Sequence, residues 1–206
     1  GAIAHYQQVL VLEPGHLEAA SALERLYQSS ANYESLAGTF LVKSSMLTDL
    51  DDRKQYLYRA AQLYEDVLGQ PLRAVEVHKQ VLELDPEDLT ALDKLIDLFL
   101  KLERWEDLLG VYSKRADIVT SPEEKKALLA EMGAVYEREL RDNARAIDTY
   151  QRILEVDPDD RAAIARLDAL YVATENWNEL LSMLEREVDL TDDPYEAVSF
   201  RYRIAE

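Results

Sequence analysis

The chain contains no cysteine, and only six of its 206 residues are glycine and six are proline. The absence of cysteine excludes disulfides, thiol catalysis and cysteine-ligated zinc. It also fits a reducing compartment, so we expect a cytoplasmic location. The few glycines are scattered, which excludes a glycine-rich phosphate-binding loop. No run of 18 apolar residues occurs, so we expect no membrane insertion.

Basic side chains are scarce relative to acidic ones. The chain has 23 lysines and arginines against 41 aspartates and glutamates, which gives a net charge of −18. This charge repels nucleic acids and anionic lipid, and it attracts basic partners. A plainer alternative is that the charge keeps a long exposed surface soluble. Hydrophobic residues make up 48% of the chain, which is enough for a folded core.

Patterns that support catalysis or bind metal are also missing. The three histidines form no His-Glu-x-x-His motif, and none has a nucleophile at useful spacing. The acidic cluster at 157–160 lacks the spacing and the glycine of a calcium loop, and it is typical of a helix start. We therefore predict a protein that is not an enzyme and that has no cofactor and no metal site.

What the chain does contain is a repeat of 72 residues that runs through its whole length without a gap. A fixed period predicts a stack of similar units, each of which buries its apolar face against its neighbours. His78 shares its repeat position with two tyrosines, so we expect it to be a packing residue. The matched positions include Ala2/Ala74/Ala146, Tyr6/His78/Tyr150, Pro14/Pro86/Pro158, Leu23/Leu95/Leu167, Tyr27/Phe99/Tyr171 and Tyr33/Trp105/Trp177.

Each 72-residue block is predicted to hold four helices. Strand and hairpin signals are missing, and apolar residues recur at helical spacing. The clearest helix start is Ser121-Pro122 with Glu124, which forms a capping box. The whole chain is predicted to form about twelve helices, with one unpaired helix at each end and five antiparallel pairs between them. In the middle block we expect helices near 74–84, 88–102, 105–118 and 122–140.

These residues resemble the tetratricopeptide repeat (TPR) family, whose pattern places small, aromatic and proline residues at set positions of a helix pair. Trp105 and Trp177 depart from it, because they stand where the family prefers tyrosine, and Thr120 stands where a proline belongs. Met132-Gly133, Tyr136, Ala146, Tyr150 and Pro158 match best, followed by Ala60-Ala61, Tyr64, Ala74, His78 and Pro86.

The resemblance implies an all-α, right-handed superhelical solenoid. We expect one solenoid domain over 1–206, in blocks 2–73, 74–145 and 146–206. The chain begins with Gly-Ala and stops inside a helical pattern, so we expect it to be truncated at both ends. In the family's packing scheme, a small residue such as Gly133 lets two helices approach closely. Trp105 and Trp177 would then wedge between the helices of a pair.

The resemblance also implies a binding surface, because the first helix of each TPR pair lines the concave face. The polar, acidic part of this face is followed by a stripe of alanines, which can admit an amphipathic or apolar segment. The alternative is that the alanines only allow neighbouring helices to pack tightly. These positions lack the set of lysines, arginines and asparagines that the family's carboxylate clamp needs. The candidate binding residues are Tyr58, Gln62, Glu65, Asp66, Asp93, Asp97, Lys101, Ala130, Ala134, Glu137, Arg138 and Tyr202.

We predict a non-enzymatic scaffold or adaptor that binds a basic or amphipathic segment of another protein, with Tyr58 as the leading single contact. Long TPR arrays of bacterial proteins that organise multi-protein assemblies are similar in style. The alternative is an architectural spacer or self-association module, including a helical-repeat scaffold of the RNA-processing kind, with no peptide groove in use. Apolar residues near the ends would normally pack on further repeats, so we expect self-association there. These residues are Ile3, Val9, Leu10, Phe200 and Ile204.

Overall fold

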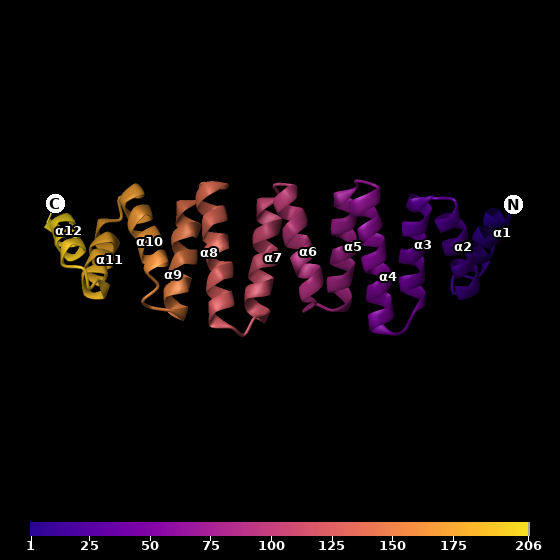
Figure 1. Cartoon of the computed structure of the whole chain (residues 1–206), viewed down its shortest axis with the longest axis horizontal. Helices are drawn as coiled ribbons and strands as arrows, with labels where there is room; N and C mark the ends of the chain where they lie inside the picture. The colour runs from indigo at the N-terminus through magenta and orange to yellow at the C-terminus, as the bar shows by residue number, and fades with distance from the viewer. Residues whose placement is uncertain (206) are drawn as a thin grey trace. The chain divides into compact units, whose positions relative to one another are not determined.

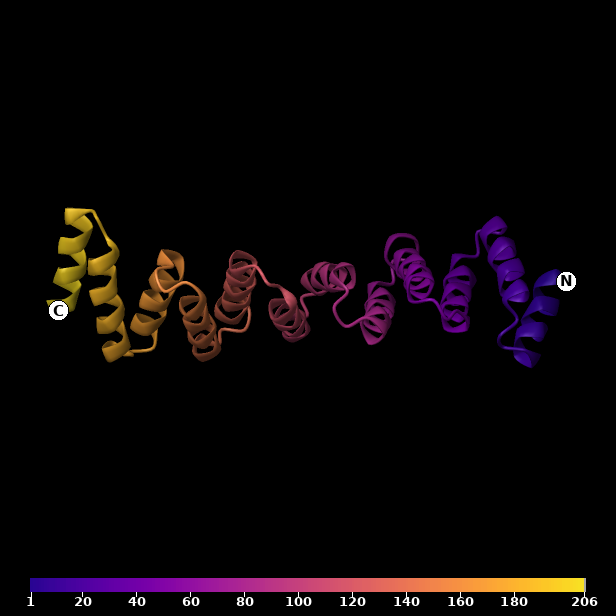
Figure 2. The same cartoon turned by 90° about the horizontal axis from the view of Figure 1, so that it is seen from below.

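The computed structural model describes residues 1–205, and this part of the chain is all helical, without strands. Its helices follow one another through short connections, as Figure 1 and Figure 2 show. The prediction of an all-α helical-repeat solenoid with about twelve helices is confirmed. The helices are α1 (Ala2–Leu12), α2 (Leu17–Ser29), α3 (Tyr33–Met46), α4 (Leu50–Gln62) with its π-helical extension η1 (Leu63–Val67), α5 (Pro71–Leu84), α6 (Leu89–Lys101), α7 (Trp105–Ile118), α8 (Pro122–Arg138), α9 (Asn143–Val156), α10 (Arg161–Ala173), α11 (Trp177–Leu190) and α12 (Pro194–Ala205).

The chain divides into two compact units. Unit 1 spans 1–102 and holds α1 to α6, and unit 2 spans 103–206 and holds α7 to α12. Within each unit, every helix packs against the next one along the chain. The boundary between the units falls within the predicted helix pair over 88–118. Each of the other four predicted pairs lies within a single unit. The single domain over 1–206 stays a prediction, and each unit is described by itself below.

Several of the helices begin where the sequence places capping side chains. Asp88 accepts a hydrogen bond from the Ala91 amide at 2.9 Å, and Asp160 accepts one from Ala163 at the same distance. Ser121 Oγ accepts from the Glu124 amide at 3.4 Å, which is one half of the predicted capping box. The Glu124 carboxylate instead accepts a hydrogen bond from Arg115 at 3.0 Å. The proline and the cap therefore start α8, while the glutamate ties it to α7.

The 72-residue period is also visible in the backbone at the helix ends. Ala31, Glu103 and Glu175 share one repeat position, and all three have φ between 52 and 58°. Gly69 and Arg141 share another, with φ of 61° and 52°. This left-handed region ends a helix and favours glycine, yet only one of the five residues is a glycine. The packing of the repeats therefore imposes these turns on residues that do not favour them.

The core consists of the repeat-matched apolar positions. Leu23, Leu95 and Leu167 are each at most 3% exposed, and the aromatic position represented by Phe99 is equally buried. Gly133 confirms the predicted close approach of two helices, because a Cβ added there would lie 2.6 Å from Cζ of Tyr150. His78 is 3% exposed, as expected of a packing residue.

The expected tryptophan wedge is wrong for Trp177, which is 59% exposed. Trp105 is half-buried, and the matched Tyr33 is 38% exposed. All three residues open their helices, at the first positions of α3, α7 and α11. A side chain at such a position leans toward the helix N-terminus and beyond the packed turns. Trp177 therefore contributes less to the core than the wedge would.

Replacing Trp177 with alanine should lower the free energy of unfolding by less than about 1 kcal/mol, in line with a surface substitution. The side chain keeps most of its area in water in the folded chain, so its removal leaves no large cavity. Urea unfolding followed by circular dichroism measures the difference. A loss of about 3 kcal/mol or more in the free energy of unfolding would show that Trp177 packs between the two helices, as the sequence predicted.

Candidate functional site

In unit 1 the predicted residues of α4 and η1 gather around one pocket. Its volume is about 280 Å³, and α4, η1, α5 and α6 all contribute to its lining. Four of the predicted binding residues line it, together with three residues that the prediction did not include in its candidate set. The lining residues are Tyr58, Gln62, Glu65, Asp66, His78, Thr90 and Lys94.

Tyr58 is tied into this pocket by its hydroxyl. The hydroxyl donates a hydrogen bond of 2.5 Å to Oδ1 of Asp88, the residue that caps α6. Burial and the Asp88 carboxylate raise the pKa of Tyr58 above its ordinary value. The ring lies 5.9 Å from the ring of His78. The predicted leading contact residue is therefore half-buried, and its hydroxyl is engaged within the chain.

The predicted residues of α6 continue the acidic surface. Lys101 donates to Glu65 at 2.7 Å. This hydrogen bond from Lys101 lowers the pKa of Glu65 despite partial burial. The carboxylates of Asp97 and Asp66 add to the negative field around Lys101 and help to raise its pKa. Asp93 and Asp97 are exposed on α6. In unit 1 the structure therefore brings acidic and amide side chains together, with Lys94 in the pocket lining and Lys101 paired with Glu65.

In unit 2 a larger pocket lies at the matched positions of α8, α9 and α10. Its volume is about 450 Å³. Ala130, Ala134 and Arg138 line it, as does Tyr150. Glu137 accepts a hydrogen bond from the Tyr150 hydroxyl at 3.3 Å and pairs with Arg166 at 3.5 Å. Burial, with a smaller effect of Glu137, raises the pKa of Tyr150 to about 12.

Tyr202 shares the repeat position of Tyr58 and Ala130 but does not join the unit 2 pocket. It lies on α12 and is 66% exposed. The structure thus divides the predicted binding residues among two pockets, the exposed face of α6 and one separate tyrosine, while Glu137 lies beside the second pocket through its contacts with Tyr150 and Arg166.

Sequence reasoning missed a lysine in α4 and its counterpart in α8, each of which binds two aspartates at the start of a following helix. Lys54 donates to Asp85 at 2.7 Å and to Asp88 at 2.9 Å. The matched Lys126 donates to Asp157 at 2.6 Å and to Asp160 at 3.2 Å. These hydrogen bonds raise the pKa of both lysines. The signal was available, because the lysine and both aspartates recur 72 residues apart.

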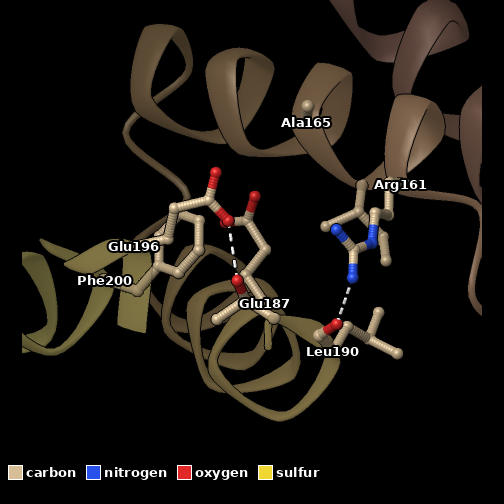
Figure 3. A pocket seen from close by; sticks show the side chains of 8 residues that line it. Arg161, Ala165, Glu187, Leu190, Glu196 and Phe200 are labelled. Carbon is tan, nitrogen blue, oxygen red and sulfur yellow. Dashed lines mark hydrogen bonds between the residues drawn. The ribbon is translucent and has the colours of Figure 1, made fainter. Parts of the chain in front are cut away.

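A third cavity lies between α10, α11 and α12 of unit 2, and Figure 3 shows its lining. The carboxyl groups of Glu187 and Glu196 point toward it, and Glu196 accepts a hydrogen bond of 2.6 Å from Thr191. Arg161 donates to the carbonyl of Leu190. Burial and the nearby Asp168 raise the pKa of Glu187. One block earlier, Arg115 and Glu124 occupy the positions of Glu187 and Glu196 and form a hydrogen bond. Glu187 thus stands where the previous block has an arginine.

Among the described residues, no group of three or more histidines and carboxylates is placed to hold a metal ion. None of the described helices is both long and apolar enough to cross a membrane.

Comparison with known families identifies one section of the chain. The family model for the tetratricopeptide repeat matches residues 128–162, which cover most of α8, all of α9 and the start of α10. The search of curated proteins found no match.

Solved structures of similar fold cover nearly the whole chain. The structure of MamA is 13% identical, covers 94% of each chain and has a TM-score of 0.44. YrrB, described as a TPR protein with an unusual peptide-binding site, is 16% identical over 96% of this chain and 97% of its own, with a TM-score of 0.44. BtubC from P. vanneervenii is 18% identical over 99% of this chain and 88% of its own, with a TM-score of 0.43. At these identities and scores, the functions of these proteins do not transfer to this chain.

Residues 128–162 are thus a tetratricopeptide repeat, and the 72-residue register extends the same helix arrangement through the rest of the chain. The chain is a TPR-type helical-repeat protein. Repeats of this type ordinarily serve as scaffolds for protein interaction and not as enzymes.

Proposed function

We propose that this protein is an adaptor that holds a basic or amphipathic segment of a partner protein against the surfaces of α4 to α6 and of α8 to α10. The observation that carries the proposal is the gathering of predicted residues into two pockets at matched repeat positions. The 72-residue repeat brings matched positions together in both units, so a partner would meet two corresponding surfaces of different chemistry.

The charge of the first surface favours a basic segment. Glu65, Asp66, Asp93 and Asp97 lie on η1 and α6, and the net charge of the whole chain is −18. Such a field speeds the encounter with a positively charged partner and selects against an acidic one. The second surface has alanines among its charged lining residues, and apolar contact with these alanines would slow dissociation of an amphipathic segment.

The double substitution Asp93→Lys with Asp97→Lys should remove at least about 90% of the partner captured from a lysate of the source organism. Two side-chain charges change sign on the face that would meet a basic segment, a change of four units in net charge, and like charges across an interface oppose association. The matched control is Glu83→Lys with Glu87→Lys, which makes the same change at exposed positions outside the pocket of α4 to α6. Quantitative mass spectrometry of the captured proteins, with both variants beside the wild type, measures the effect.

Equal capture by both variants would contradict the proposal and favour the spacer alternative. One observation speaks for that alternative, because α1 and α12 bury none of their residues. Val11 and Leu12 of α1, and Tyr195 and Val198 of α12, are all at least 65% exposed. Capture of other copies of this chain by both variants would identify it as a self-association module.

A further inference from the structure

The two pockets allow a direct comparison, because most residues that line the unit 1 pocket have a counterpart 72 positions later in the lining of the unit 2 pocket. His78 of unit 1 corresponds to Tyr150 of unit 2, and Asp88 corresponds to Asp160. Lys54 and Lys126 make the same pair of hydrogen bonds. The position that differs most in size is Tyr58, which corresponds to Ala130.

In unit 1 the Tyr58 side chain fills part of this site. Its ring lies beside the ring of His78, and its hydroxyl reaches Oδ1 of Asp88. The Asp88 side chain is only 8% exposed as a result of its several partners. Tyr58 shows which chemical group this arrangement accepts, namely a phenol whose hydroxyl donates to the capping aspartate.

In unit 2 the same site is open. The pocket is larger, at about 450 Å³ against about 280 Å³, and it extends past Ala130 to Lys126 and Asp160. The matched Lys54 and Asp88 do not line the smaller pocket, which reaches only as far as Tyr58. Asp160 accepts hydrogen bonds from Ala163 and Lys126 but has no phenol donor, and its side chain is 20% exposed.

We infer that the unit 2 pocket binds a tyrosine side chain of a partner protein, in the place that Tyr58 occupies in unit 1. The ring would lie over Ala130 and beside Tyr150, and the hydroxyl would donate to Asp160. The inference rests on the proposed function, because it specifies what the α8 to α10 surface holds. Offset or tilted ring contacts and a hydrogen bond to a carboxylate are both favourable in such a partly enclosed site.

The lining explains why a phenol suits the pocket better than a purely apolar group. Alanines at 130, 134 and 162 replace the matched Tyr58, Gln62 and Thr90 and provide an apolar wall for a ring. The far end of the pocket is charged, with Lys126 and Asp160. A side chain without a donor would add no hydrogen bond to the Asp160 carboxylate, whereas a phenol would donate one as Tyr58 donates to Asp88.

The test uses 4-methylphenol as the probe and the full 206-residue chain with ¹³C-labelled alanine methyl groups. We expect the methyl signals of Ala130, Ala134 and Ala162 to shift with a Kd on the order of 1 mM, typical of a fragment of this size. The matched compound 4-methylanisole has the same ring without the donor. It should bind about tenfold more weakly, because the hydrogen bond to a charged acceptor is lost.

Four variants test the site through the correspondence between the two units. Ala130→Tyr should abolish binding of 4-methylphenol, because the new tyrosine side chain would fill the pocket as Tyr58 does in unit 1. Tyr58→Ala should open a second site and raise the stoichiometry from one to two. Tyr58→Phe keeps the ring in place and should leave it at one. Asp160→Asn keeps a capping side chain and should reduce the preference for 4-methylphenol over 4-methylanisole to about twofold.

Shifts that persist in Ala130→Tyr, equal binding of the two compounds, or no shift in the wild type would each overturn the inference. The proposed function is judged separately by the capture experiment with Asp93 and Asp97. Loss of capture in the Asp93 and Asp97 variant, with no binding of 4-methylphenol, would support the adaptor function and contradict the tyrosine pocket. Binding of 4-methylphenol with unchanged capture would support the tyrosine pocket and contradict a role of the acidic surface in partner binding.

Discussion

Replacing Gly133 with alanine is expected to lower the free energy of unfolding of unit 2 by about 1–2 kcal/mol. The added Cβ would lie 2.6 Å from Cζ and 2.7 Å from Cε1 of Tyr150, closer than such atoms approach. Forcing one extra carbon into a packed contact costs about 1–3 kcal/mol, and the better helix propensity of alanine offsets up to about 1 kcal/mol of that. Urea unfolding measured by circular dichroism, with amide hydrogen exchange to locate the loss, checks the value.

The matching pair in unit 1 indicates how this loss is repaired. Ala61 and His78 occupy the positions of Gly133 and Tyr150. In unit 1 the extra methyl group of alanine is therefore matched by a smaller ring. The double variant Gly133→Ala with Tyr150→His copies that pair into unit 2. A double-mutant cycle should show a favourable coupling of about 1 kcal/mol or more between the two changes.

A second glycine provides the control for helix propensity alone. Gly110 lies in α7 of the same unit, and a Cβ added there would meet no atom within 4 Å. Gly110→Ala should therefore stabilise the chain by about 0.4–1 kcal/mol. If Gly133→Ala stabilised it equally, the close contact with Tyr150 would not limit the packing of α8 on α9.

Acidification from pH 7 to pH 4 should cost unit 1 on the order of 3 kcal/mol through His78 alone. Burial lowers the pKa of this imidazole from 6.5 to about 4. Glu65 and Asp88 work in the opposite direction, Lys94 adds to the lowering, and the neutral Tyr58 ring lies alongside. Below pH 6.5 the unfolded chain takes up a proton that the folded chain refuses until about pH 4, so stability falls across that window.

The measurement needs a variant in which this position cannot titrate. The double variant Ala61→Gly with His78→Tyr copies the Gly133 and Tyr150 pair into unit 1. Carboxylates with lowered pKa values, such as Glu65 and Asp88, lose stability with acid in both proteins. The difference between the two stability curves from pH 7 to pH 4 therefore reports His78. Parallel curves over that range would show that His78 is protonated without cost in the folded chain.

The core could be predicted from the sequence because each repeat meets the same neighbours. Leu95, Phe99 and Gly133 are buried or closely packed as the register indicated. The Trp177 prediction failed for a geometric reason. A large apolar side chain in register signals burial, but at the first position of a helix it extends beyond the packed turns.

The candidate site was predicted only in part. The resemblance to the TPR family implied that Gln62, Glu65 and Ala134 face a binding surface, and the structure brings them to the pockets. The resemblance did not indicate that Tyr58 would reach Asp88, because that contact joins residues 30 positions apart on different helices. Such a contact depends on the spacing and tilt of α4 against α6, which no local pattern encodes.

The sequence by itself determined the repeat, the helix starts and the buried positions. These follow from local capping chemistry and from a period that gives every unit the same apolar neighbours. The tertiary structure decided which side chains fill the space between helices. Tyr58 closes the pocket of unit 1 and Ala130 leaves that of unit 2 open, because the size of one side chain matters only once three helices surround it.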